Sequence, residues 1–282
     1  MYRRENLWPR LLKIKYNDLY NMSIHNLAVV SKGARLGENV TIEPFANIYE
    51  DVEIGDNCWI GSGAIIMNGA RIGNNCKIFP GAVIAGEPQD LKFNGEYSTV
   101  QIGARTTIRE CATVNRGSAA KGTTIVGEDC LLMAYTHVAH DCIIGNRCVL
   151  VNYSGIAGEV EIGDWSILGG GTMIHQFVKV GEHVMFRGGS LVGKDVPPYI
   201  IAGREPLSYC GLNTVGLRRR GFQNDKINEI QDIYRVLFNQ GMNYADAIRY
   251  IEENFGATEE RDTIINFVRS SKRGILKGLL DE

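Results

Sequence analysis

The sequence has few prolines and no long hydrophobic run. Only 7 of its 282 residues are proline, against 33 glycines, and the glycines do not recur at every third position. This pattern excludes a collagen-like triple helix and a proline-rich linker. No segment approaches the roughly 18 consecutive apolar residues of a membrane-spanning helix, so we expect no membrane span. With 44% hydrophobic residues, the chain can bury a large core.

The sequence also lacks closely spaced cysteine pairs and a strong charge of either sign. Its 7 cysteines are odd in number and contain no C-x-x-C motif. This favours reduced thiols in a cytoplasmic protein over a disulfide framework or a zinc site. The formal net charge of −2 gives no general attraction to nucleic acid, so we expect no nucleic-acid partner. An acidic partner needs a local basic patch.

The N-terminal residues 1–21 are basic and aromatic, but they do not form a secretory signal. They lack the continuous apolar stretch and the small-residue cleavage site of such a signal. The organised sequence begins near Met22. We therefore treat residues 1–21 as a leader or as the product of an upstream translation start, and we expect them to be poorly ordered.

What the sequence does contain is an aliphatic residue at every sixth position. The repeat runs from Ile24 to Ile84, resumes at Ile102, and continues after a second break to Val192. This period, with glycine at many corners, is typical of a parallel β-helix in which three hexapeptides form one coil. We predict a mainly-β fold, a left-handed parallel β-helix over residues 22–212, with the repeated residues pointing inward. In a β-sandwich, apolar and polar residues would instead alternate at every second position.

Two segments, residues 85–101 and 115–123, interrupt the repeat and are predicted to protrude as loops. Loops on a rigid scaffold often carry binding groups. After residue 212 the repeat stops and helical periodicity begins, so we predict an α-helical C-terminal domain over residues 213–282. We expect three helices in this domain. The first begins near Asn224 or Asp225, the second ends at Gly256, and the third runs from a Thr258 cap to Gly274.

The segment THVAHDC holds two of the five histidines, His137 and His140, with Asp141 directly after the second. A histidine beside a carboxylate suits a general base, because the carboxylate fixes the tautomer and stabilises the imidazolium. An isolated His-Asp pair, however, is more often a solvated surface pair. A metal site is disfavoured, because zinc needs three converging ligands and residues three apart on an extended chain point to opposite faces.

Residues that differ by a multiple of one coil lie in one column of a β-helix. We therefore expect one edge of the prism to carry His140, Asp141, Gly158, Glu159, His175 and Gln176. A smooth prism has no cleft of its own, and a second subunit packed against this edge creates one. We expect a homotrimer, the economical closed arrangement for a triangular prism.

Several motifs together resemble one enzyme family. The segments GEPQDLKFNG, THVAHDCIIGNRC, IHQF, DVPPYIIA and GLRRRGF occur in order on the hexapeptide scaffold. They resemble the UDP-N-acetylglucosamine O-acyltransferases of lipid A biosynthesis over residues 22–282. The resemblance implies transfer of a (R)-3-hydroxyacyl chain from acyl carrier protein to the sugar 3-hydroxyl. It implies a homotrimer and neither a metal nor a cofactor.

The resemblance also implies roles for individual residues. His140 is the implied general base, Asp141 its orienting partner, and the Gly158 N–H the oxyanion donor. The implied substrate contacts are Gln89, Asp90, Lys92, His137, Glu159, His175, Gln176, Gly188, Asn213, Arg219 and Arg220. The arginines suit phosphate and an acidic carrier protein. A glycine at position 188 implies a long acyl chain.

Two positions depart from the family pattern, and other functions stay open. Glu159 stands where well-studied members carry a histidine, and Val215 stands where they carry a glutamate. The acceptor is therefore open to an amino-sugar nucleotide. The residues before the repeat are too few for the uridine-binding domain of the related N-acyltransferase. A coenzyme A acetyltransferase, a metal-dependent hydratase and a non-catalytic β-helix that binds a partner are the remaining alternatives.

Overall fold

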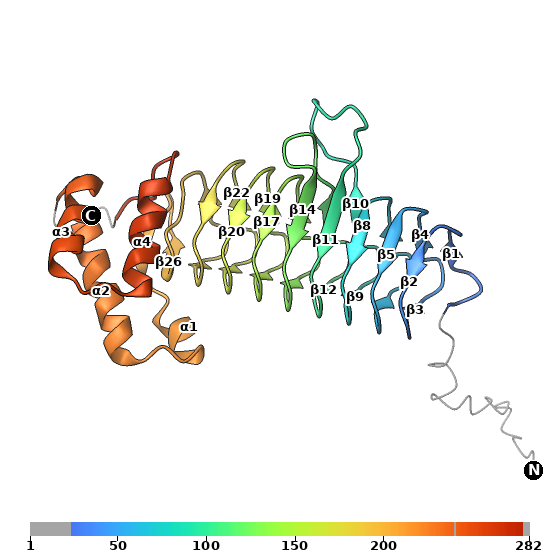
Figure 1. The fold of residues 1–282 in the computed structure, drawn as a ribbon, viewed down its shortest axis with the longest axis horizontal. Helices are drawn as coiled ribbons and strands as arrows, with labels where there is room; N and C mark the ends of the chain where they lie inside the picture. The colour runs from blue at the N-terminus through green and yellow to red at the C-terminus, as the bar shows by residue number, and fades with distance from the viewer. Residues whose placement is uncertain (1–23, 240, 279–282) are drawn as a thin grey trace, which may run out of the picture.

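The computed structural model describes residues 24–239 and 241–278, which form a long triangular prism followed by a cluster of helices (Figure 1). The predicted leader, residues 1–21, lies outside the described residues. The prism is a left-handed parallel β-helix, which confirms the predicted mainly-β fold class.

Three sheets form the faces of the prism, and each coil contributes one short strand to each face. Face I contains β1 (Val29–Val30), β4 (Asn47–Ile48), β7 (Ile65–Ile66), β10 (Val83–Gly86), β13 (Thr113–Asn115), β16 (His137–Val138), β19 (Gly155–Ile156), β22 (Met173–Ile174) and β25 (Leu191–Val192). Face II contains β2 (Arg35–Leu36), β5 (Val52–Ile54), β8 (Ala70–Ile72), β11 (Thr99–Ile102), β14 (Thr123–Val126), β17 (Ile143–Ile144), β20 (Glu161–Ile162) and β23 (Lys179–Val180). Face III contains β3 (Thr41–Ile42), β6 (Trp59–Ile60), β9 (Lys77–Ile78), β12 (Thr107–Ile108), β15 (Leu131–Leu132), β18 (Val149–Leu150), β21 (Ile167–Leu168), β24 (Met185–Phe186), β26 (Ile200–Gly203) and β27 (Ser208–Leu212).

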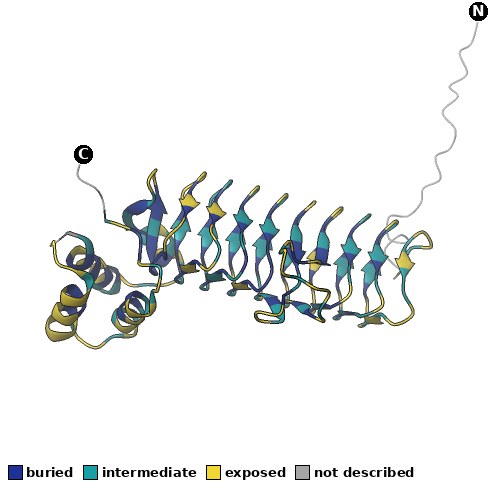
Figure 2. Ribbon diagram, turned by 90° about the horizontal axis from the view of Figure 1, so that it is seen from above, coloured by how far each residue is buried: buried dark blue, intermediate teal, exposed yellow. Residues whose placement is uncertain are grey.

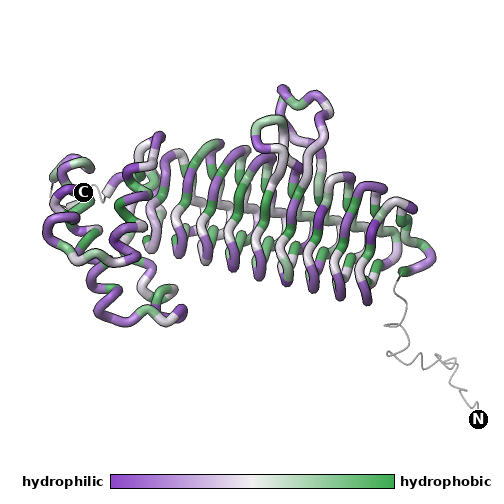
Figure 3. The backbone as a smooth tube through the Cα atoms, in the orientation of Figure 1, coloured by the Kyte–Doolittle hydropathy of each residue, from purple (hydrophilic) through white to green (hydrophobic). Residues whose placement is uncertain are grey.

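The repeated aliphatic residues fill the interior of the prism, as predicted. From Ile42 to Val192 they are all buried, and Figure 2 shows buried segments along every coil between partly exposed ones. Figure 3 shows the same alternation as hydropathy along each coil. The first coil is different: Ile24 is 40% exposed, and Val30 and Leu36 are only partly buried. These residues contact a neighbouring coil on one side only within the described chain.

The corners of the coils are closed by left-handed backbone and by buried thiols and hydroxyls. One residue at most corners has a positive φ, for example Asn57 at 56° and Asp141 at 60°. Small polar side chains then donate to backbone carbonyls of the next coil. Cys130 Sγ, for example, is 3.1 Å from the carbonyl oxygen of Gly145, and Ser166 Oγ is 2.9 Å from that of Gly181. These contacts satisfy corner carbonyls that the ladders leave unpaired.

Both breaks in the repeat protrude from the same edge, between faces I and II. The first loop connects β10 to β11 and the second connects β13 to β14, and they stand together above the prism in Figure 1. The register is kept across both, since Val83 pairs with Thr113 and Thr113 pairs with His137. The loops are therefore insertions into a continuous β-helix.

Within the described part of the chain, four helices follow the antiparallel pair β26–β27: α1 (Thr214–Arg219), α2 (Asn224–Asn239), α3 (Tyr244–Asn254) and α4 (Glu259–Ser270). Helix α1 was not predicted from the sequence. Thr258 caps α4 as expected, since its side chain accepts from the N–H of Arg261. The expected end at Gly274 is wrong, because Ser271 is extended and its hydroxyl donates to Asp195, after which the chain returns to the prism. No helix within the described residues is long and apolar enough to cross a membrane.

Candidate active site

His140 lies at the edge between faces I and II, after β16 and before β17. Its side chain is buried, and its Nδ1 is 2.8 Å from Oδ2 of Asp141. An ionised carboxylate only accepts hydrogen bonds, so Nδ1 carries the proton in the neutral ring. Nε2 is then left with a lone pair, which is the state that a general base requires.

Asp141 is fully buried, and the second loop supplies its hydrogen bonds. The Ser118 hydroxyl donates to Oδ2 at 2.6 Å, and the N–H groups of Ser118 and Lys121 donate to Oδ1 at 3.0 Å. Burial raises the pKa of the Asp141 carboxyl, but the hydrogen bonds from Ser118, His140 and Lys121 outweigh it and hold the pKa below its ordinary value. Asp141 is therefore charged at neutral pH and stabilises an imidazolium on His140.

Gly158 lies one coil above His140. The N–H of Glu159 donates to the carbonyl of His140 at 3.0 Å, and the N–H of Phe177 donates to that of Gly158 at 3.1 Å. A Cβ at Gly158 lies only 2.5 Å from His140 Nε2, so glycine is needed to leave room for the ring. Among the hydrogen bonds of the described chain, the Gly158 N–H has no acceptor. It is free to donate to a ligand.

The first loop brings a second carboxylate near the other ring nitrogen of His140, Nε2. Asp90 Oδ2 is 3.9 Å from His140 Nε2, and Oδ1 accepts from the N–H of Lys92 at 3.0 Å. The side chains of Gln89 and Lys92 are exposed at this loop. Of the three predicted loop residues, Asp90 is the one with a contact to the base, at 3.9 Å, among the described residues.

His137 lies on face I in register with Gly155 and Met173. Its Nδ1 is 2.7 Å from Thr113 Oγ1. Burial lowers the pKa of His137, and the neighbouring His140 lowers it further, so the ring is neutral at pH 7. A neutral ring bonded to a hydroxyl suits substrate contact better than proton removal.

His175 and Gln176 lie at the same edge as His140, after β22. Sequence reasoning missed their partner, Arg273, from the segment that follows α4. One Arg273 nitrogen is 3.1 Å from the carbonyl oxygen of Gln176, and another is 3.3 Å from Nδ1 of His175. No motif marks Arg273 in the sequence, because it reaches the site only through the returning chain.

The remaining candidates lie on other edges of the prism. Gly188 lies at the edge between faces I and III. If a side chain were added at this position, its Cβ would lie 3.3 Å from the carbonyl oxygen of Gly170, the nearest atom. Asn213 is buried as the cap of α1, and Arg219 is exposed on that helix. Arg220 donates to the carbonyl of Trp165 at 2.8 Å and lies 3.0 Å from His183 Nδ1, at the edge between faces II and III. Within a single chain, these residues therefore do not lie close to His140.

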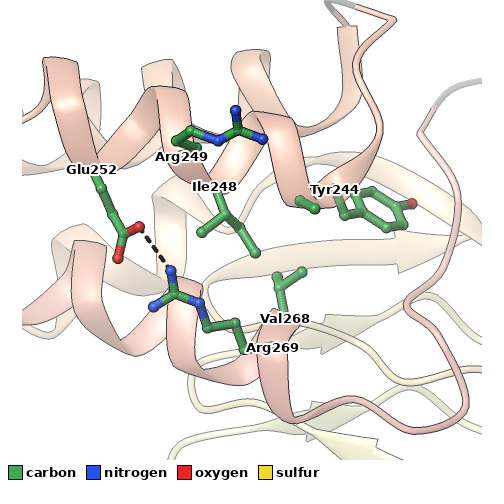
Figure 4. A pocket seen from close by; sticks show the side chains of 7 residues that line it. Tyr244, Ile248, Arg249, Glu252, Val268 and Arg269 are labelled. Carbon is green, nitrogen blue, oxygen red and sulfur yellow. Dashed lines mark hydrogen bonds and ion pairs between the residues drawn. The ribbon is translucent and has the colours of Figure 1, made fainter.

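A surface hollow in the helical domain contains none of the candidates. It lies between α3 and α4, and an ion pair of 2.7 Å between Glu252 and Arg269 crosses it (Figure 4). Tyr244, Ile248 and Val268 form its apolar wall. The chemistry at His140 is therefore separate from this hollow.

Comparison with known proteins identifies the scaffold and the family. The model described as bacterial transferase hexapeptide (six repeats) matches residues 33–63, 51–86 and 123–158, and the model described as UDP N-acetylglucosamine O-acyltransferase, domain 2, matches residues 195–276. An acyl-[acyl-carrier-protein]–UDP-N-acetylglucosamine O-acyltransferase of Chlorobaculum parvum is 56% identical over 89% of this chain and 96% of its own. The crystal structure of a UDP-N-acetylglucosamine acyltransferase from Bacteroides fragilis has a TM-score of 0.89 and 50% identity, covering 90% of this chain and 99% of that one.

The fold, the hexapeptide repeats and the sequence similarity define an acyltransferase of the hexapeptide-repeat class. Within that class, the chain belongs to the UDP-N-acetylglucosamine O-acyltransferase family.

Proposed function

We propose that this protein transfers a (R)-3-hydroxyacyl chain from acyl carrier protein to the 3-hydroxyl of UDP-N-acetylglucosamine, with His140 as the general base. One observation carries the mechanism: Nδ1 of His140 is bonded to buried Asp141, while Nε2 lies beside Gly158, whose N–H has no acceptor among the described residues. A base and an oxyanion donor beside each other are the two groups that acyl transfer to a hydroxyl requires.

The steps follow from this geometry. Nε2 of His140 takes the proton of the sugar 3-hydroxyl as its oxygen attacks the thioester carbonyl carbon. The carbonyl oxygen becomes negatively charged and accepts a hydrogen bond from the Gly158 N–H. As the intermediate collapses, the carbon–sulfur bond breaks and the imidazolium returns the proton to the leaving thiolate. Asp141 stabilises the imidazolium between the two transfers, and Asp90 is near enough to accept from a second sugar hydroxyl.

Face I offers an apolar path for the acyl chain between two edges of the prism. Gly155, Met173 and Leu191 are stacked there in register, and Met173 and Leu191 are 47% and 57% exposed. A shallow hollow lined by Met173, Leu191 and His175 runs along this face. An acyl chain that leaves His140 across face I meets the far edge, where Gly188 leaves space for its end.

A homotrimer accounts for candidates that lie on different edges. Face II is charged and forms ion pairs such as Lys179 with Glu161 at 3.0 Å, which suits solvent. Faces I and III carry apolar outward residues in the later coils, including Met173 and Leu191 on face I and Ile167 and Met185 on face III. If faces I and III pack against neighbouring copies, His140 of one copy meets α1 of the next, with its Arg219. Exposed Arg218 and Arg219 also attract an acidic carrier protein.

The test is a transfer assay with 3-hydroxyacyl carrier protein and UDP-N-acetylglucosamine, followed by mass spectrometry of the sugar product. We expect wild type to form the 3-O-acyl product and His140→Ala to lose at least about a hundredfold in kcat. His25→Ala, a histidine of the first coil, is the matched control. An inactive wild type with both this acceptor and its 3-amino analogue refutes the function. Full activity of His140→Ala refutes the mechanism.

The 3-amino analogue also tests the second candidate acceptor. Glu159 is half-buried, and its N–H donates to the His140 carbonyl at 3.0 Å. A carboxylate at this position would favour a cationic amino group on the acceptor. A kcat/KM for the amino analogue above that for UDP-N-acetylglucosamine assigns the amino sugar as the acceptor.

A further inference from the structure

The second protruding loop contacts the buried end of the His140–Asp141 pair. The Ser118 hydroxyl and the His140 ring bind the same carboxylate oxygen, Oδ2, at 2.6 and 2.8 Å. Oδ1 accepts from the N–H groups of Ser118 and Lys121, both at 3.0 Å. Among the described residues, every hydrogen bond that the carboxylate makes, apart from the one to His140, therefore comes from this loop.

We infer that Ser118 is a positioning residue for the catalytic base, extending the pair to a chain Ser118–Asp141–His140. This inference rests on the proposed function. Ser118 does not face the reacting atoms, because it is buried behind Asp141. It acts by fixing the carboxylate that holds the ring and by removing part of the negative charge from the oxygen that the ring contacts.

The loop itself is anchored well enough to hold Ser118 in place. The N–H of Gly122 donates to the Ser118 carbonyl at 2.7 Å, and Thr123 Oγ1 is 2.9 Å from Thr99 Oγ1. Lys121 Nζ is 3.2 Å from Glu161 Oε1. The Asp141 main chain is pinned as well, since its N–H donates to Thr124 Oγ1 at 2.8 Å. Little freedom is left to the carboxylate while the Ser118 hydroxyl is present.

The two protruding loops are also connected to each other. Glu96 of the first loop accepts from the N–H of Ala119, next to Ser118, at 2.8 Å. The first loop carries Asp90, which approaches Nε2 of the same histidine. The first loop thus approaches Nε2 directly, the second loop holds the carboxylate bonded to Nδ1, and the Glu96 contact connects the two loops.

The test compares Ser118→Ala, Ser118→Thr and the wild type in the transfer assay over a range of pH. With Ser118→Ala we expect about a tenfold loss in kcat, because the base is less well oriented, and a change of less than about twofold in the KM for the sugar nucleotide. The acid limb of kcat/KM moves to higher pH, since more negative charge at Oδ2 favours the imidazolium. Ser118→Thr keeps the hydroxyl, so we expect its kcat and the position of its acid limb to match those of the wild type.

Two further variants keep the outcome decisive. Ser166→Ala removes another buried hydroxyl of the prism and is expected to leave the pH profile unchanged. If Ser118→Ala does not fold, Ser118→Cys replaces the hydroxyl by a weaker donor and is expected to shift the acid limb in the same direction. An active wild type and an inactive His140→Ala, together with an unshifted profile in the Ser118 variants, overturn this inference alone. An inactive wild type overturns the proposed function instead.

Discussion

Replacement of Gly158 by alanine tests whether the ring of His140 must lie where the structure has it. The new Cβ is 2.5 Å from Nε2 and 2.6 Å from Cε1, whereas ordinary contacts begin near 3.4 Å. The ring must therefore move by about 1 Å, and such a misplacement of a reacting group costs about a hundredfold in rate. This corresponds to about 2.7 kcal/mol in the activation free energy. Alanine keeps the backbone N–H, so the loss reports the base and not the oxyanion donor.

The assay is the steady-state kcat of Gly158→Ala, with unfolding by urea as a check on the fold. If the ring loses its bond to Asp141, the free energy of unfolding falls by roughly 1.5 to 3 kcal/mol. Gly256→Ala is the control, because a Cβ there meets no atom within 4 Å. A folded Gly158→Ala enzyme with kcat within about threefold of wild type refutes the assignment of His140 as a base held against Gly158.

Three further predictions concern the acyl groove, the assembly and the pH dependence of stability. Gly188→Met should shift the preference toward shorter 3-hydroxyacyl donors in competition assays, and an unchanged preference removes Gly188 as the limit on chain length. Met173→Lys, which adds a charge to apolar face I, should shift the particle mass in solution toward monomer in light scattering, while Lys179→Met on face II should not. Burial and the nearby Arg220 lower the pKa of His183 to about 4, so the unfolded chain binds a proton first as pH falls below its ordinary value near 6.5. The free energy of unfolding, measured by urea titration, should drop by up to about 3 kcal/mol between these pH values. His183→Phe should lose less stability over the same pH range. An equal loss of stability in the variant assigns the effect to other groups.

The sequence predicted the prism well because its structure depends on local spacing. A residue that returns every six positions must point to the same side of each face, so its burial follows from its phase. The helical domain was less predictable. The return of the chain after Ser270 depends on Asp195, far away in sequence, which accepts from Ser271. Helix α1 is too short for periodicity to reveal, and it depends on the Asn213 cap.

The site was predictable where its residues share a column and hidden where they do not. The separation of His140 and Gly158 by one coil places them together, and the structure has them in contact. Ser118 and Arg273 had no such signal. Ser118 lies in an insertion whose path is set by its own turns, and Arg273 reaches His175 through tertiary packing. Spacing in a solenoid predicts neighbours along the axis, and it carries no information about segments that leave the coil.

The two insertions themselves point to the site. A β-helix needs no extra residues to bury its core, so an interruption of the repeat has a cost in chain entropy that the scaffold does not require. Both interruptions leave the prism at the edge where His140 lies, in the coils just before it. One brings Asp90 toward Nε2, and the other brings Ser118 to the carboxylate bonded to Nδ1. The regular coils thus fix the base in one column, and the breaks in the repeat supply the groups that make this histidine different from the other residues of its edge.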